Sequence, residues 1–253
     1  FFDPLMGTLQ LSPIEIPFTR EQMLARFGPS MIVGAATLGP RLLQQFLKIK
    51  TLGGSVQNPD VIIVPTGETR KFLELPQDNK MTRTRVCVLD TGVAFPHPLF
   101  HPSKGMLYLD STIEQPAWMD GLGHGTWTLT CAFGDSYDTR FGPCQGVADP
   151  ENGTLGSIKC LSTAGFGTSF SVLQAMEKAW KWGAKVVSMS LGGPLQGGVD
   201  FDPECQIIER LAEEVIFVVA AGNDGPDPWT IGSPGASPYA LTVGAWSPVY
   251  GDL

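Results

Sequence analysis

The chain has 253 residues, 43% of them hydrophobic, and a formal net charge of −8. This is long enough to bury one sizeable core, or one core with a small appendage. The 17 lysines and arginines form no cluster that would displace counterions from a nucleic acid, and no apolar run approaches the ~20 residues that span a bilayer. Composition therefore argues against a nucleic-acid partner and against a membrane span.

Residues 1–80 differ in pattern from the rest of the chain and carry no catalytic motif. Helical spacing of apolar residues predicts helices over 19–27 and 40–50, and a short strand is expected over 61–64. The chain begins with Phe1 and not with Met, which favours an internal fragment or a processed product. We expect residues 1–80 to form a helical or α+β extension that is either ancillary or similar to a pro-segment.

Residues 81–253 alternate between buried strands and amphipathic helices. Helical periodicity covers 168–182, with Gly183 at the C-cap position, and 203–214, with Pro203 in the first turn. Apolar runs too continuous for half-exposed strands lie at 86–89, 156–161, 185–191, 215–221 and 240–245. The alternation predicts an α/β fold with three layers, in which helices cover both faces of a doubly wound, mostly parallel sheet.

Three polar residues stand at or just after the ends of predicted strands: Asp90, Ser190 and Asn223. In open parallel sheets, ligand sites form outside the carboxyl ends of the strands. We therefore expect these three residues to meet at one edge of the sheet.

Asp90 begins an Asp-Thr-Gly sequence, which alone is most often a turn. The same three residues match half of the signature of pepsin-like aspartic proteases. That chemistry needs two carboxylates that share a proton, and the chain contains no second Asp-Thr-Gly or Asp-Ser-Gly. The sequence argues against a single-chain enzyme of that class.

Three histidines are present, and only one of them has a functional context. His97 and His101 lie among prolines, which prevent the helical pairing that a metal site would use, so they are predicted to be loop residues. His124 has a glycine on each side and precedes an apolar stretch, which predicts a helix start with room for close approach. Asn223 is either part of a plain Asn-Asp-Gly turn or a rigid amide donor of the kind that stabilises an oxyanion.

The five cysteines show no metal-binding spacing. Cys87 and Cys160 lie in predicted strands and Cys131 in a predicted helix, so these three are expected to be core residues. Cys144 and Cys205 lie in more polar stretches, and the sequence leaves open whether they pair or stay free.

Four motifs, in this order, resemble the subtilisin-like serine proteases, or subtilases. They are Val88-Leu89-Asp90-Thr91-Gly92, Gly123-His124-Gly125-Thr126, Ser188-Met189-Ser190-Leu191-Gly192-Gly193 and Ala220-Ala221-Gly222-Asn223. The resemblance runs from about residue 83 to residue 245 and implies a subtilisin-like fold for 81–253. A nucleotide-binding module is disfavoured, because the chain has no phosphate-binding loop.

The resemblance implies roles for three catalytic residues. Asp90 would orient His124 and stabilise its imidazolium, and His124 would act first as general base and then as general acid. Asn223 would donate its side-chain amide to the oxyanion. No cofactor is implied, although Asp135 and Asp138 occupy the place of a loop that binds calcium in some relatives.

The resemblance also implies a site for an extended polypeptide substrate. The edge strand at 190–192 would pair with the substrate backbone, and small residues would line a broad, apolar-tolerant pocket beside it. The residues concerned are Ser190, Leu191, Gly192, Ala220, Ala221, Gly222 and Gly232. A cis peptide bond between Ser233 and Pro234 is implied as well.

The serine nucleophile of this family lies on a helix well beyond the strand that matches 240–245, outside this chain. Gly167-Thr168-Ser169 has the letters of the nucleophile motif, but it stands at the start of the helix 168–182, and we interpret Ser169 as a helix cap. The chain alone is predicted to be inactive, with its own C-terminal segment as a separate or missing partner. The alternative is a subtilisin-fold pseudoenzyme with a structural or assembly role in a larger complex.

Overall fold

The computed structural model describes residues 34–35, 74–75, 80–81, 83–97, 99–100, 106–112, 114, 116–139, 142–151, 153–195, 197–225, 227–247 and 251–252. The helices expected over 19–27 and 40–50, the strand expected over 61–64, and His101 lie outside these residues. The division of the chain near residue 80 stays a prediction.

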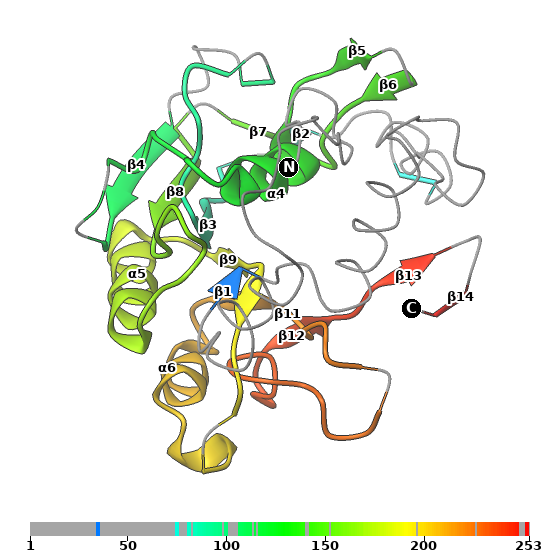
Figure 1. Ribbon diagram of the computed structural model, residues 1–253. Coiled ribbons are helices and arrows are strands. Elements are labelled where there is room, and N and C mark those ends of the chain that lie inside the picture. The colour runs from blue at the N-terminus through cyan, green and yellow to red at the C-terminus, as the bar shows by residue number, and fades with distance from the viewer. Residues whose placement is uncertain are drawn as a thin grey trace.

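A six-stranded sheet forms the centre of the described structure (Figure 1). In spatial order its strands are β12 (Leu241–Val243), β11 (Ile216–Ala220), β9 (Val186–Met189), β3 (Val86–Asp90), β8 (Leu155–Lys159) and β4 (Met106–Asp110). All neighbouring strands are parallel. The chain first builds the β4 and β8 side of β3 and then crosses to β9, so the strand order reverses beside β3. Such a switch point is where doubly wound sheets form their sites.

Five of these strands coincide with the predicted apolar runs, but β4 is not among them. It stands at the edge of the sheet, and all five of its residues are half-buried. The described residues between β3 and β4 form no crossover helix, so the alternation of strands and helices does not reveal it.

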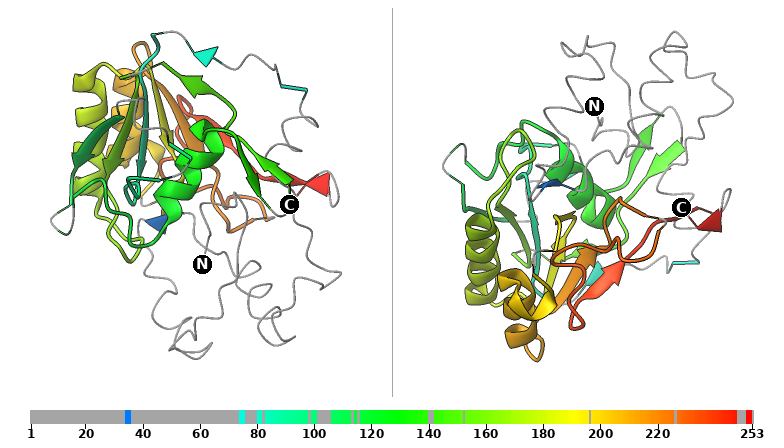
Figure 2. Two further views of the ribbon diagram at one scale, coloured as in Figure 1. Left: turned by 90° about the horizontal axis from the view of Figure 1, so that it is seen from above. Right: turned by 60° about the horizontal axis from the view of Figure 1, so that its bottom comes forward.

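Three layers follow from the alternation of side chains along each strand. Cys87 and Leu89 of β3 point to one face, where they pack with α5 (Ser169–Trp182) and α6 (Pro203–Leu211). Val86 and Val88 point to the other face, where they pack with α4 (His124–Phe133). Figure 2 shows α4 on the opposite side of the sheet from α5 and α6. The predicted α/β architecture is confirmed.

The face that carries α4 is only partly covered. Val88 pairs in register with Ser188, Ser188 with Val218, and Val218 with Leu241, so all four side chains point to this face. Leu241 is 59% exposed, and Val243, which pairs with Ala220, is 50% exposed. Among the described residues, the β11 and β12 end of this face therefore presents apolar side chains to solvent.

The helix ends follow their local sequence, with one correction. The predicted C-cap Gly183 adopts a left-handed conformation at φ 86°, and Pro203 begins α6. The N-cap of α5 is Thr168 and not Ser169: the Thr168 hydroxyl accepts from the Ser171 N–H, and the Ser171 hydroxyl accepts from the Thr168 N–H. Ser169 is the first residue inside the helix.

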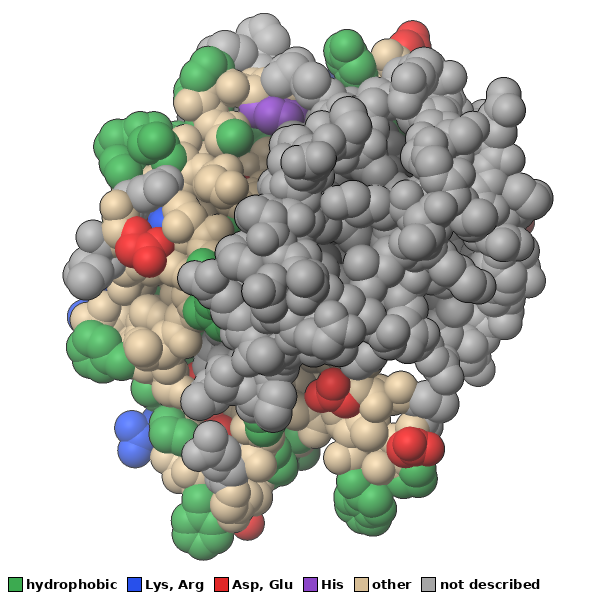
Figure 3. All heavy atoms as spheres, viewed as in Figure 1, with side chains coloured by type: hydrophobic (Ala, Val, Ile, Leu, Met, Phe, Trp, Pro, Cys, Tyr) green, Lys and Arg blue, Asp and Glu red, His purple; other side chains and the backbone are tan. Residues whose placement is uncertain are grey.

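The remaining described elements are short. β1 (Gly34–Ala35) pairs antiparallel with β10 (Leu191–Gly192), and β2 (Lys80–Met81) pairs in parallel with β7 (Asp149–Pro150). The others are the antiparallel pairs β5 (Tyr137–Thr139) with β6 (Gly142–Cys144) and β13 (Trp246–Ser247) with β14 (Gly251–Asp252), and the 3-10 helix η2 (Val199–Phe201). On the face shown in Figure 3, lysine and arginine side chains of the described residues lie apart from one another. In the described part of the chain, no helix is both long and apolar enough to cross a membrane.

All five cysteines are free thiols. Cys87 and Cys160 are fully buried, as predicted, and Cys131 is half-buried in α4. The polar sequence context of Cys144 and Cys205 is misleading, because both side chains are 98% shielded from solvent and unlinked. Cys205 lies on the inner side of α6, where its thiol faces the carbonyl of Pro234.

Candidate active site

Asp90 is the last residue of β3, and only 1% of it is exposed. Its Oδ1 accepts a hydrogen bond from the Thr91 N–H at 2.7 Å and lies 2.7 Å from Nδ1 of His124. Its Oδ2 accepts a bond of 3.2 Å from the Thr128 hydroxyl. The turn after β3 and the helix α4 therefore hold both carboxylate oxygens in place at the edge of the sheet.

His124 is the first residue of α4 and is 5% exposed. The helix begins after Gly123, whose φ of 85° lies in the left-handed region that favours glycine. On the other side of His124, a Cβ on Gly125 would overlap the carbonyl oxygen of Gly92 and lie 3.1 Å from Cβ of Asp90. The glycines around His124 thus allow the helix start to lie against the Asp90 turn, which is the close approach that the sequence predicts.

The charges around His124 favour its protonated form. Burial on its own lowers the pKa of His124, but the charge of Asp90, the hydrogen bond to Asp90 and the charge of Asp120 outweigh that effect. The pKa of His124 is therefore raised above its ordinary value. A buried imidazole that bonds a carboxylate through Nδ1 has its Nε2 left for proton transfer with another group.

The other predicted polar residues follow neighbouring strands at the same edge. Leu89, Met189 and Val219 pair in register across β3, β9 and β11. Asp90 and Ser190 come directly after the first two of these residues, and the exposed Asn223 follows β11 by three positions. The carboxyl ends of three adjacent strands thus carry the residues that the sequence predicts to meet.

The predicted substrate-binding residues lie in three backbone segments that contact one another. Ser233 and Gly193 exchange two backbone hydrogen bonds of 2.8 Å, which join the end of β10 to the segment 232–233. A Cβ on Gly192 would lie 2.9 Å from the Ser233 carbonyl oxygen, and a Cβ on Gly235 would lie 2.6 Å from that of Ala220. The segments 220–222, 190–193 and 232–235 are therefore packed together through small residues. The Ser233–Pro234 bond is cis, as expected.

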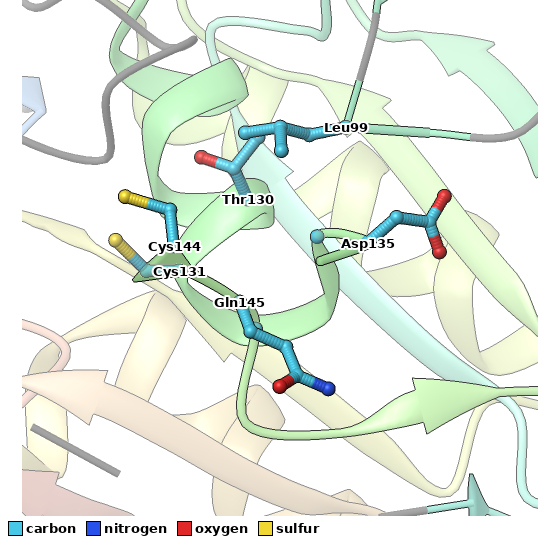
Figure 4. A pocket seen from close by; sticks show the side chains of 8 residues that line it. Leu99, Thr130, Cys131, Asp135, Cys144 and Gln145 are labelled. Carbon is cyan, nitrogen blue, oxygen red and sulfur yellow. The ribbon is translucent and has the colours of Figure 1, made fainter. Parts of the chain in front are cut away.

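A separate shallow hollow lies at the far end of α4 (Figure 4). Thr130, Cys131 and Gly134 line it from the helix end, and Cys144 lines it from β6. None of the predicted catalytic or substrate-binding residues contributes to it. It is therefore distinct from the site at the edge of the sheet.

Comparison with known proteins decides the family. Residues 82–249 match the family model described as the Subtilase family, which is more than half of the chain. The chain belongs to the subtilase family. The resemblance carried by the four sequence motifs is thereby confirmed.

Several curated subtilases are similar to this chain. It is 32% identical over 165 residues to the minor extracellular protease Vpr of Bacillus subtilis, covering 64% of this chain and 20% of the relative. It is 33% identical over 174 residues to the serine protease AprX of Bacillus subtilis, covering 63% and 37%. It is 30% identical over 177 residues to subtilisin DY of Bacillus licheniformis, covering 67% and 58%. In each case the chain spans less than two thirds of the relative.

Two polar residues of this subtilase site escape sequence reasoning. Lys159 on β8 is fully buried, and its Nζ donates to the carbonyls of Thr91 at 2.7 Å and Leu161 at 2.9 Å. Burial lowers the pKa of Lys159, while nearby carboxylates, Asp120 foremost, oppose that effect. The sequence signal that could have identified Lys159 is a lysine inside an otherwise apolar strand. Asp120 lies in a glycine-rich turn, where an aspartate carries no distinctive signal.

The calcium expectation concerns Asp135 and Asp138. Asp138 is exposed on β5, and Asp135 follows the end of α4. In the described ranges, no three histidine, cysteine or acidic side chains are grouped so as to hold a metal ion. Calcium also takes backbone carbonyls and waters as ligands, so the calcium expectation stays a prediction.

Proposed function

We propose that this chain is the N-terminal and central part of a subtilisin-like serine endopeptidase. In this proposal an Asp-His-Ser triad hydrolyses peptide bonds in extended polypeptides, and its serine lies outside the 253 residues. The observation that supports it most directly is the buried contact of 2.7 Å between His124 Nδ1 and Asp90 Oδ1. Family membership and the strand-end position of Asn223 support the same function.

The proposed chemistry starts from the orientation of the imidazole. The Asp90 carboxylate accepts a hydrogen bond from Nδ1–H, so Nδ1 keeps its proton and Nε2 is unprotonated. Nε2 then takes the proton of the serine hydroxyl as that oxygen attacks the substrate carbonyl carbon. The negative charge of Asp90 then stabilises the imidazolium, which returns its proton to the leaving amine. Asn223 donates its amide to the oxyanion of the tetrahedral intermediate.

The partly covered sheet face supports the proposal that a further segment of the protein packs on it. Leu241 and Val243 present apolar side chains over β12, and a further segment with an apolar face would bury them. Such a segment would pack beside α4, on the same face as His124. We propose that this segment belongs to the remainder of the protein and carries the serine.

The chain alone is therefore expected not to react with a fluorophosphonate probe, and it should not cleave peptides. Labelling is expected only when the C-terminal segment of the protein is added or co-expressed, and the label should lie on that segment. The complete protein should also have an intact mass well above 27.2 kDa. A complemented His124→Ala variant is the matched control, and it should lose turnover.

Two outcomes would contradict the proposal. If the isolated chain were labelled, the nucleophile would lie within it. Ser169→Ala would then test whether the Gly167-Thr168-Ser169 sequence supplies that nucleophile. If the C-terminal segment bound the chain but gave neither labelling nor turnover, the pseudoenzyme with a structural or assembly role would replace the protease.

We also propose that residues 1–80 act like a pro-segment, with β10 as the strand that receives the substrate. Support comes from β1: Gly34 and Ala35 already pair antiparallel with Gly192 and Leu191. An extended peptide bound at the same place would use the same backbone groups.

A peptide of residues 1–80 added in trans is accordingly expected to inhibit the complete protein competitively. Replacing both Gly34 and Ala35 by proline removes two backbone N–H groups and should weaken inhibition at least ~10-fold, the equivalent of one or two lost hydrogen bonds. Inhibition constants of the two peptides measure the effect. Equal constants would show that the β1 pairing has no inhibitory role.

A further inference from the structure

Asp120, four residues before His124, accepts hydrogen bonds from five donors. Its Oδ1 accepts from the backbone N–H groups of Gly123 at 2.8 Å and Leu122 at 3.2 Å, and from the Thr91 hydroxyl at 2.9 Å. Its Oδ2 accepts from the N–H and the hydroxyl of Thr126, at 2.8 and 2.7 Å.

The first turn of α4 depends on this carboxylate. The N-cap position is Gly123, which has no side chain to accept from the free N–H groups of the helix start. Asp120 takes over that function from outside the helix, because it accepts from Gly123 and from Thr126, the third residue of α4. The negative charge at the N-terminus also matches the helix dipole.

The same carboxylate connects α4 to the turn that follows Asp90. The Thr91 hydroxyl donates to Asp120 and accepts from the Gly125 N–H at 2.8 Å, while the Thr91 N–H bonds Asp90. The Thr126 hydroxyl accepts from the Ala94 N–H at 2.8 Å. Two threonines, one from each segment, thus bridge the helix start and the Asp90 turn, and both are bound to Asp120.

The charged groups around His124 come from three elements. Asp90 at the end of β3 and Asp120 before α4 act on the imidazole directly, and both raise the pKa of His124. Lys159 on β8 donates to the Thr91 carbonyl, and its ammonium interacts with the charge of Asp120.

We propose that Asp120 is a positioning residue of the site. It holds the first turn of α4 against the Asp90 turn, so that His124 stays in register with Asp90, and it adds a second negative charge that stabilises the imidazolium. Its consequence for turnover rests on the proposed function, but its effect on His124 does not.

Nuclear magnetic resonance titration of the three histidines in the 253-residue chain tests the proposal. In Asp120→Asn, the pKa of His124 should fall, because an opposite charge is removed. The low-field signal of the Nδ1 proton that bonds Asp90 should weaken. The control is Asp110→Asn: Asp110 ends β4 at the same edge of the sheet, and its Oδ1 accepts hydrogen bonds from the N–H and the hydroxyl of Thr112. It removes the same charge and should leave both readouts unchanged.

An unchanged His124 pKa and an unchanged low-field signal in Asp120→Asn would overturn the proposal. If that variant does not fold, Thr91→Val gives a second test, because it keeps the carboxylate and removes the hydroxyl that joins Asp120 to Gly125. The low-field signal should then weaken, and a signal equal to that of the unmodified chain would also overturn the proposal.

In the complete protein, Asp120→Asn should lower kcat with little change in KM and move the acidic limb of the kcat/KM profile to lower pH. The limb moves in that direction because a less basic His124 loses its proton at lower pH. A purely structural residue would change stability without moving the limb. If the complete protein is no protease, the titration of His124 still decides the role of Asp120.

Discussion

If Asp90 belongs to the proposed triad, Asp90→Asn in the complete protein is expected to lower kcat about 10⁴-fold and to leave KM nearly unchanged, the effect that this change has in a serine-protease triad. An asparagine in this place donates through its amide, so it favours the tautomer of His124 in which Nδ1 has no proton. The proton then sits on Nε2, which cannot accept one from the serine, and no charge stabilises an imidazolium. Steady-state kinetics with a peptide substrate measure the loss.

Thr128→Val is the matched control for this prediction. It removes the 3.2 Å bond to Asp90 Oδ2 and leaves the contact between Oδ1 and His124 Nδ1 in place. Its kcat should fall far less than that of Asp90→Asn. If Asp90→Asn kept activity within tenfold of the unmodified protein, the triad role of Asp90 would be wrong.

The second large effect is expected at Glu204, a carboxyl group in the first turn of α6 that is only 3% exposed. Burial raises the pKa of Glu204 to about 7, and the charge of Asp202 adds to this. Hydrogen bonds with Ser169 and Ser233 act in the opposite direction. Ser233 belongs to the segment that packs against β10, so this carboxyl group lies behind the proposed substrate-binding strand.

The raised pKa makes stability depend on pH. Because the folded chain binds the Glu204 proton more tightly than the unfolded chain, the stabilisation is fully present below about pH 4.5 and is lost as pH rises through about 7. A shift of this size corresponds to about 3 kcal/mol. Glu204→Gln, which stays neutral, should remove this dependence and raise the free energy of unfolding at pH 8 by up to about 3 kcal/mol.

Urea unfolding at pH 4.5 and pH 8 measures this difference. The control is Glu209→Gln, which removes an exposed carboxylate from the same helix and should leave the pH dependence as it is. The raised pKa of His124 adds to the pH dependence of stability in the same direction in all three proteins. The difference between them therefore reports the contribution of Glu204 alone. Parallel pH dependences for the unmodified protein and Glu204→Gln would contradict the prediction.

Runs of apolar residues predict the buried strands of this subtilase well. The run 86–89 is apolar at every position because β3 is buried on both faces, and such runs stand out in a sequence. Where two neighbouring residues are both suited to cap a helix, the sequence does not decide between them. Thr168 and Ser169 are both acceptable caps, and the path of the chain into α5 decides for Thr168.

Burial of isolated residues was predicted less well, because it depends on what a distant segment places on top of them. Cys144 and Cys205 lie in polar stretches of sequence and are nevertheless buried. The edge strand β4 is the opposite case. Among the described residues, it has no partner strand on one side and no helix before it, so neither an apolar run nor a preceding helix marks it in the sequence.

The sequence by itself determined the order of the five strands with apolar runs and of the helices between them, the polar residues at the strand ends and the glycines that leave room around His124. These features are local, because burial and turn geometry restrict which residue types stand at neighbouring positions. Only the tertiary structure decided that Asp90 and His124, 34 positions apart, meet at 2.7 Å, and that Asp120 and Lys159 support them. Those contacts depend on how α4 and β8 pack against β3, and hydrogen bonds between distant segments leave no periodic trace in a sequence.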